Sequence, residues 1–107
     1  MWVFDTDRTA GAYESITVAN ASIGFTKRTM KPITGAFKDM FAKVVFCTLE
    51  TNNIRFRIDG TAPTTSEGHL LSVGQLLTLK NAADIENFRA INAVVAASGI
   101  LKVTFRF

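Results

Sequence analysis

The sequence predicts an all-β fold, a single-domain antiparallel β-sandwich of the jelly-roll kind with about eight short strands and little helix. Residues 54–58 and 101–107 alternate apolar with charged or polar side chains, which is the period of a strand with one buried face. Turn residues interrupt the chain about every ten residues, as they do in sandwiches. The chain has 107 residues, of which 48% are apolar, so one core can form without disulfide support.

Residues 1–12 are expected to form a loosely held N-terminal arm, and residues 13–107 the β-sandwich domain. The arm is polar after its fourth residue and has no apolar period. Trp2 and Phe4 are the exceptions, and they would dock either on the body of the domain or on a neighbouring subunit.

Turn signals divide the domain into short segments. Residues 20–22, 59–63 and 96–99 carry residue types that favour turns. Asn81 followed by acidic residues predicts one helical turn over residues 82–87, because Asn caps a helix and acids suit its first turn. We expect strands at residues 13–18, 23–26, 41–50, 54–58, 68–73, 75–79, 88–91 and 100–107.

The segment over residues 41–50 is the most apolar of these strands. Val45, Cys47 and Leu49 point to one side, while Val44 and Phe46 point to the other. A strand with two apolar faces is typical of the middle of a sheet, and its second face needs a cover, either another sheet or another subunit. Residues 52–53 then favour a turn that makes a hairpin with the strand over residues 54–58.

Residues 27–40 carry no clear pattern, because Pro32 ends any helix before it and Gly35 interrupts the residues after it. We expect a long connection there, in which residues 27–32 continue a strand end into a loop and residues 36–41 form one helical turn or another loop. Met30 and Phe37 nevertheless lie in this segment, and Met40 and Phe41 stand at its end.

Small domains seldom expose such side chains without a partner. Two interpretations stay open: these residues form a lid over one end of the core, or they form a self-association surface. The candidate self-association surface consists of Trp2, Phe4, Met40 and Phe41.

The formal net charge is +3, and no run of five or more basic residues occurs. The strands predicted over residues 54–58 and 100–107 each carry two basic residues on one face. These residues would form a basic outer face if the two strands shared a sheet. Single-strand binders also present aromatic residues between the cations, whereas Phe56 and Phe105 fall on the core side here. We therefore expect a solvated face and no nucleic-acid binding. The candidate basic outer face consists of Arg55, Arg57, Lys102 and Arg106.

The residues that most reactions need are scarce. One histidine and one cysteine are too few for a transition-metal site or an intrachain disulfide. Cys47 lies inside an apolar strand, which favours a small buried side chain over a reactive thiol. His69 comes after a glycine at a strand start, which favours a turn or edge residue over a catalytic base. We expect no catalytic residue, cofactor or metal.

The N-terminus does not resemble a signal peptide, since Asp5 and Asp7 come directly after a very short apolar start. No apolar stretch approaches the ~20 residues that span a bilayer. We expect a protein without membrane segments, in a virion or in the cytoplasm of its host.

Four stretches resemble small uncharacterised proteins encoded among the head and tail genes of tailed bacteriophages. Those proteins share an Arg-x-Asp-Gly-Thr-x-Pro-Thr segment, a Gly-His-x-Leu segment, an Asn-Phe-Arg-Ala-Ile strand and a closing strand. The resemblance covers residues 15–107 and implies a virion structural or accessory protein with no catalytic residue to transfer. The matching stretches are residues 57–64, 68–71, 87–91 and 101–107, with residues 16–25 similar to the first strands.

The expected function is therefore binding to copies of itself and to other virion proteins. A carbohydrate or cell-surface binding module of the jelly-roll type is the alternative, although Tyr13 and Trp2 are the only Tyr and Trp side chains on which a sugar ring could stack. An enzyme is a third hypothesis, which an acidic group around His69 in a deep pocket would favour.

Overall fold

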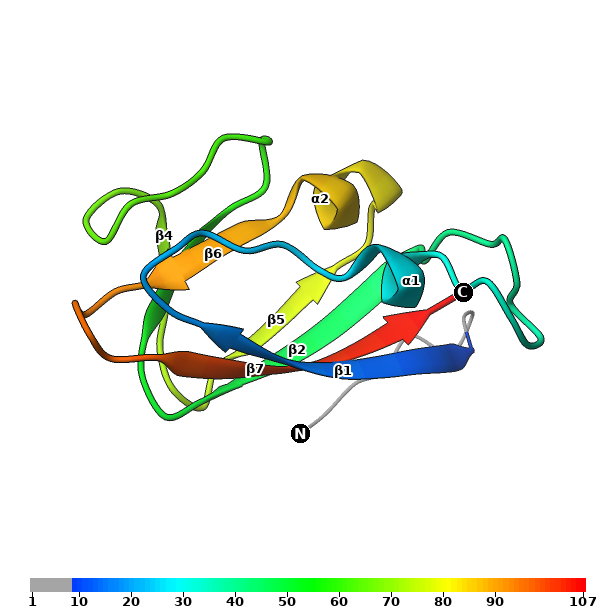
Figure 1. Ribbon diagram of the computed structural model, residues 1–107, viewed down its shortest axis with the longest axis horizontal. Coiled ribbons are helices and arrows are strands. Elements are labelled where there is room, and N and C mark those ends of the chain that lie inside the picture. The colour runs from blue at the N-terminus through cyan, green and yellow to red at the C-terminus, as the bar shows by residue number, and fades with distance from the viewer. Residues whose placement is uncertain (1–8) are drawn as a thin grey trace.

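The computed structural model describes residues 9–107 and folds into two antiparallel β-sheets (Figure 1). The four-stranded sheet has the order β1-β7-β2-β5, and the three-stranded sheet has the order β4-β3-β6. Two short helices lie in the connections: α1 (Lys27–Met30) links two strands of the four-stranded sheet, and α2 (Ala82–Asn87) links one sheet to the other. The strands are β1 (Ala10–Val18), β2 (Val44–Glu50), β3 (Ile54–Arg57), β4 (His69–Leu71), β5 (Leu76–Leu79), β6 (Arg89–Asn92) and β7 (Gly99–Arg106).

The all-β prediction is confirmed, since the described chain is mostly antiparallel strand with little helix. Residues 9–107 contain seven strands, because the one predicted over residues 23–26 does not form. Ile23 makes an isolated bridge to Ala90. The Phe25 side chain is buried in the core. The Thr26 backbone amide donates to the Glu14 carboxylate and therefore does not pair with a neighbouring strand.

The hairpin predicted between β2 and β3 is wrong, because these strands belong to different sheets. Each already has two neighbours: β2 lies between β7 and β5, and β3 between β4 and β6. Thr51 adopts a φ of 76° between them, and its hydroxyl and the Asn52 side-chain Nδ2 both donate to the Ser98 carbonyl. The turn at Gly74 likewise leads from β4 in one sheet to β5 in the other.

Both sheets contribute to one hydrophobic core. The prediction that the most apolar strand lies inside a sheet is confirmed for β2, whose Val45, Cys47 and Leu49 are buried. Four phenylalanine rings connect the sheets through this core: the ring of Phe105 on β7 meets that of Phe25, which stacks on Phe88, which in turn faces Phe56 on β3.

Helix α2 forms over the residues predicted for it. Its N-cap is Asn81, whose side-chain oxygen accepts hydrogen bonds from the amides of Ala83 and Asp84. Ile85 anchors the helix in the core. Neither helix in residues 9–107 has the length and apolar character needed to cross a bilayer.

Candidate functional site

The two basic pairs predicted to share an outer face lie on different sheets. Arg55 and Arg57 belong to β3 in the three-stranded sheet, whereas Lys102 and Arg106 belong to β7 in the four-stranded sheet. The shared sheet on which the common face depended is therefore absent, because β3 pairs only with β4 and β6. The predicted alternation holds over residues 101–106 of β7, where the apolar residues are buried and the basic residues are half-buried. Along β3, Ile54 is buried, but Phe56 is half-buried like the two arginines and packs against the core.

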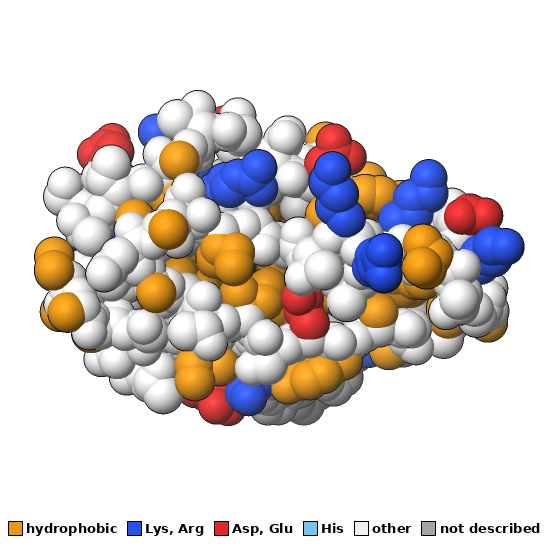
Figure 2. All heavy atoms as spheres, in the orientation of Figure 1, with side chains coloured by type: hydrophobic (Ala, Val, Ile, Leu, Met, Phe, Trp, Pro, Cys, Tyr) orange, Lys and Arg blue, Asp and Glu red, His pale blue; other side chains and the backbone are white. Residues whose placement is uncertain are grey.

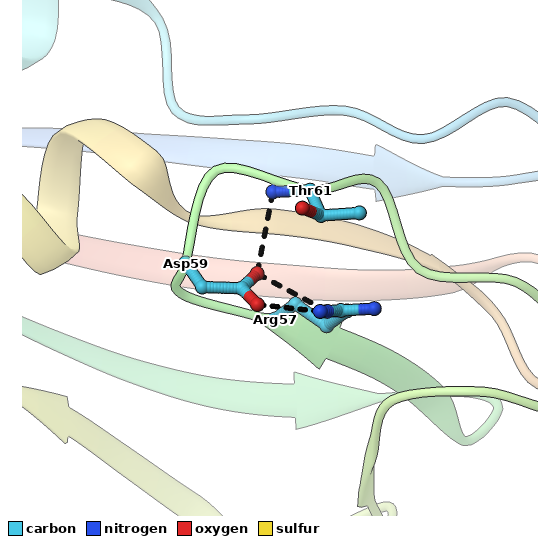
Figure 3. Close-up of polar contacts among 3 residues, drawn as sticks. All are labelled: Arg57, Asp59 and Thr61. Atoms are coloured by element: carbon cyan, nitrogen blue, oxygen red, sulfur yellow. Dashed lines mark hydrogen bonds and ion pairs between the residues drawn. The ribbon is translucent and has the colours of Figure 1, made fainter.

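Arg55 and Arg57 both hold the loop after β3. The Arg55 guanidinium donates to the carbonyls of Thr65 and Gly68, each at 3.0 Å. The Arg57 guanidinium forms a bidentate ion pair with the Asp59 carboxylate, which also accepts a hydrogen bond from the Thr61 backbone amide (Figure 3). The hydrogen bond from Arg57 lowers the pKa of Asp59, and the same bond raises the pKa of Arg57.

A concavity of about 370 Å³ lies beside this ion pair and includes His69 and Glu67. Asp59, on its wall, is already bonded to Arg57 and Thr61. The described residues of the lining contain no hydroxyl or thiol that His69 would activate as a nucleophile. Within residues 9–107, no group of three or more His, Cys, Asp or Glu side chains is placed to hold a metal. The concavity thus offers polar binding groups around a structural ion pair.

Cys47 is fully buried in β2. Burial raises the pKa of its thiol, and the nearby Glu14 carboxylate raises it further. The neutral thiol is therefore the form that the fold stabilises, as expected for a small core side chain.

One part of the segment between α1 and β2 covers the core, as the lid interpretation expects, and another part is exposed, as the self-association interpretation requires. Phe37 stacks on Phe107 with ring centroids 4.9 Å apart, and Phe41 packs against the core, so part of the segment is a lid. Met40 is 39% exposed and Ile33 is 53% exposed, so another part faces outward. Trp2 and Phe4, the other predicted members of this surface, lie outside the described residues.

A larger concavity lies where this segment meets α1 and the end of α2, and we call it the basic groove. It has a volume of about 540 Å³. Three apolar side chains, three cations, one carboxylate and one amide line it. These are Phe25, Met30, Phe41, Lys27, Lys31, Arg89, Glu86 and Asn87.

Arg89 owes its position in the groove to a glycine. Its guanidinium lies over Gly24 and donates to the Phe88 carbonyl at 3.3 Å. A Cβ atom on Gly24 would lie 2.3 Å from the Arg89 guanidinium and 2.8 Å from the Phe88 oxygen. Only glycine therefore fits at position 24 without displacing Arg89.

Glu14 fixes the other side of the groove through α1. Its carboxylate accepts hydrogen bonds from the Thr26 amide at 3.0 Å, the Thr26 hydroxyl at 2.6 Å and the Thr29 hydroxyl. Thr26 is the N-cap residue of α1, so a charge on β1 holds the helix that carries Lys27.

The cations of the groove have no acidic partner in the part of the chain that the structure describes. Among residues 9–107, Lys27, Lys31 and Arg89 form no ion pair with a carboxylate. Arg89 also lies directly across from Arg57 in the β3–β6 ladder, where like charges repel. Arg57 is neutralised by Asp59, and Arg89 is not. Figure 2 shows Lys and Arg side chains gathered over α1, α2 and the adjoining loop.

The sequence did not predict this groove. The basic residues at Lys27 and Lys31 stand out along the chain, but Arg89 is far from them in sequence. The bridge between Ile23 and Ala90 brings the two segments together. Comparisons of the chain with protein-family models, with curated protein sequences and with solved structures gave no match. The resemblance to tailed-phage proteins therefore stays a prediction.

Proposed function

We propose that this chain is a small structural or accessory protein of a tailed bacteriophage or prophage particle. It acts by binding copies of itself and other virion proteins, and its two sheets form a jelly-roll-like β-sandwich. The observation that carries the self-association is the outward-facing part of the segment between α1 and β2. Ile33 and Met40 are exposed there, beside the half-buried Phe41.

Backbone hydrogen bonds fix the conformation of this segment. The Asp39 amide donates to the Pro32 carbonyl at 2.8 Å, and the Ala42 amide donates to the Met30 carbonyl at 2.7 Å. Because the backbone is fixed, a partner that covers Ile33 and Met40 gains apolar burial without first ordering the loop. That property suits a protein whose contacts repeat identically in an assembly.

The residues that carry the phage resemblance have structural roles in this fold. Arg57 and Asp59 pair to shape a turn, in which Gly60 has a φ of 84°. Gly68 has a φ of 133°, and its open side lies against Pro63. These roles favour a scaffold over a catalyst, since the motif residues stabilise a loop.

Light scattering coupled to size-exclusion chromatography tests the self-association. We expect the full chain to elute as an oligomer and Met40→Glu to shift it toward monomer, because a charge in the contact must be desolvated. Val94→Glu is the matched control: Val94 is 55% exposed, in the turn between β6 and β7 at the opposite end of the molecule (Figure 1). Equal elution of all three proteins as monomers would contradict the proposal.

The virion assignment has a separate test in the genes that flank this one. Capsid, portal or tail genes on either side would support it, and metabolic genes on both sides would contradict it.

A carbohydrate-binding module remains the second candidate because of Tyr13, which is 59% exposed. It lies on β1 opposite Thr104 of β7, so an aromatic ring stands beside a hydroxyl on the sheet. A glycan array with the full chain and with Tyr13→Ala tests this candidate. Hits that disappear in Tyr13→Ala would favour it, and an array without hits would remove it.

A further inference from the structure

We propose that the basic groove receives residues 2–7 of a second copy of this chain. In the proposed contact, Trp2 and Phe4 of the second copy would pack on its apolar lining, and Asp5 and Asp7 of that copy would face its cations. The inference rests on the proposed self-association and adds the groove, which includes Phe41, to the contact proposed for Ile33 and Met40. Residues 1–8 lie outside the part of the chain that the structure describes, so only their sequence enters the argument.

The apolar part of the groove suits an aromatic side chain. Phe25 and Met30 are each 6% exposed, and Phe41 beside them is half-buried. The volume of about 540 Å³ is within the range of roughly 300–1,000 Å³ that small ligand sites occupy. An aromatic ring in this groove would complete the cover of Phe41 and contact two further apolar side chains.

The charges of the groove suit an acidic segment. Among the described residues, its lining holds three cations, Lys27, Lys31 and Arg89, and the carboxylate of Glu86, which leaves an excess of two positive charges there. None of the three cations is ion-paired within residues 9–107. Arg89 is also held in place over Gly24, so its guanidinium is ordered before a carboxylate arrives.

The chain contains one segment that combines these properties. Its sequence has nine acidic residues, and only residues 2–7 place two aromatic and two acidic residues within six positions. Two of the other acids are already engaged, since Glu14 binds the start of α1 and Asp59 pairs with Arg57. A groove on one copy and an acidic aromatic segment on the next form a heterologous contact, which builds rings or filaments from identical subunits.

Fluorescence anisotropy with a labelled peptide tests the chemistry of the groove. The peptide has the sequence of residues 2–7 with blocked ends, and it is titrated with the full chain. We expect saturable binding that weakens on the order of tenfold or more in Lys31→Glu/Arg89→Glu, and by a similar factor when the peptide carries Asp5→Asn and Asp7→Asn. Lys80→Glu is the matched control, because this exposed lysine lies just after β5, outside the groove, and should leave binding unchanged. Equal binding by all variants, or no binding, would overturn the inference.

Mixing two full-length variants tests whether the segment comes from a second copy. Trp2→Ala/Phe4→Ala keeps the groove and lacks the aromatic anchors, whereas Lys31→Glu/Arg89→Glu keeps the anchors and lacks the cations. We expect each variant alone to be monomeric and a mixture to form a one-to-one complex by light scattering. Monomeric variants that form no complex when mixed would place the segment in the groove of its own chain and overturn the inference.

The same experiment separates this inference from the proposed self-association. If the wild-type chain and both variants are oligomers, the self-association stands and the groove is not its contact. If the wild-type chain is a monomer at every concentration and the peptide fails to bind, both the proposed self-association and the groove contact are contradicted. Circular dichroism melts of each variant establish that the charge changes leave the fold intact.

Discussion

Phe25 and Phe88 stack with their ring centroids 4.4 Å apart and their planes 8° from parallel. Phe25 precedes α1 and Phe88 precedes β6, so the stack joins two of the segments that line the basic groove. Edge contact with Phe105 and a further ring contact with Phe56 extend it to both sheets. The stack therefore stabilises the core and also sets the spacing of the groove walls.

Phe88→Ala should lower the free energy of unfolding by about 3–5 kcal/mol, because Phe88 is 1% exposed and its removal leaves a cavity between the sheets. Urea unfolding monitored by circular dichroism measures the loss. Leu70→Ala is the control, since Leu70 is 49% exposed on β4 and should cost less than about 1 kcal/mol. Equal effects of the two substitutions would contradict the role of the ring stack.

Glu14→Gln should destabilise the fold by about 1–3 kcal/mol, since three donors of α1 and its N-cap lose a charged acceptor. The loss should also speed hydrogen exchange at the Thr26 amide, and it should weaken peptide binding through the displacement of Lys27. Glu50→Gln, at an exposed position on β2, should change stability by no more than about 0.5 kcal/mol. Unchanged exchange at Thr26 would show that Glu14 does not hold α1.

Asp59 should give the fold a pH dependence in the acid range. The pKa of Asp59 is lowered in the folded chain, chiefly by the hydrogen bond from Arg57. The unfolded chain therefore binds a proton more tightly, so this contribution is present above the unfolded pKa of about 3.9 and is lost as the pH falls through the folded pKa. Asp59→Asn should flatten the unfolding midpoint against pH in this window. An unchanged slope would mean that the ion pair does not contribute.

Cys47 should be unreactive in the folded chain, because burial raises the pKa of its thiol and excludes reagents. Ellman's reagent should label it slowly at neutral pH and fast after denaturation. The raised pKa also predicts that stability falls as the pH rises above the unfolded thiol pKa of about 8.5. Fast, complete labelling of the native chain would contradict the burial of this thiol.

Local patterns predicted much of the fold. Alternation assigned the buried and half-buried faces of β7, and Asn81 located the start of α2. Sheet membership could not be predicted, because it depends on which distant strands pair. The turns at Thr51 and Gly74 each cross from one sheet to the other, where local turn chemistry favours a hairpin.

The candidate site was accessible to sequence analysis only in part. Met40 and Phe41 stood out as apolar residues in a connection without a clear pattern, and the structure places Phe41 in the groove and Met40 on the surface. The position of Arg89 depends on the absence of a side chain at Gly24, and that of α1 on a carboxylate from β1. Such contacts between distant segments leave no periodic signal in the sequence.

Sedimentation equilibrium of the full chain over a wide range of concentrations tests the central claim most directly, because the claim is that this protein acts by binding its own copies. The account predicts an average mass that rises with concentration to a multiple of the monomer mass, and that returns to the monomer mass in Lys31→Glu/Arg89→Glu. A wild-type chain that stays at the monomer mass up to the highest concentration would contradict it.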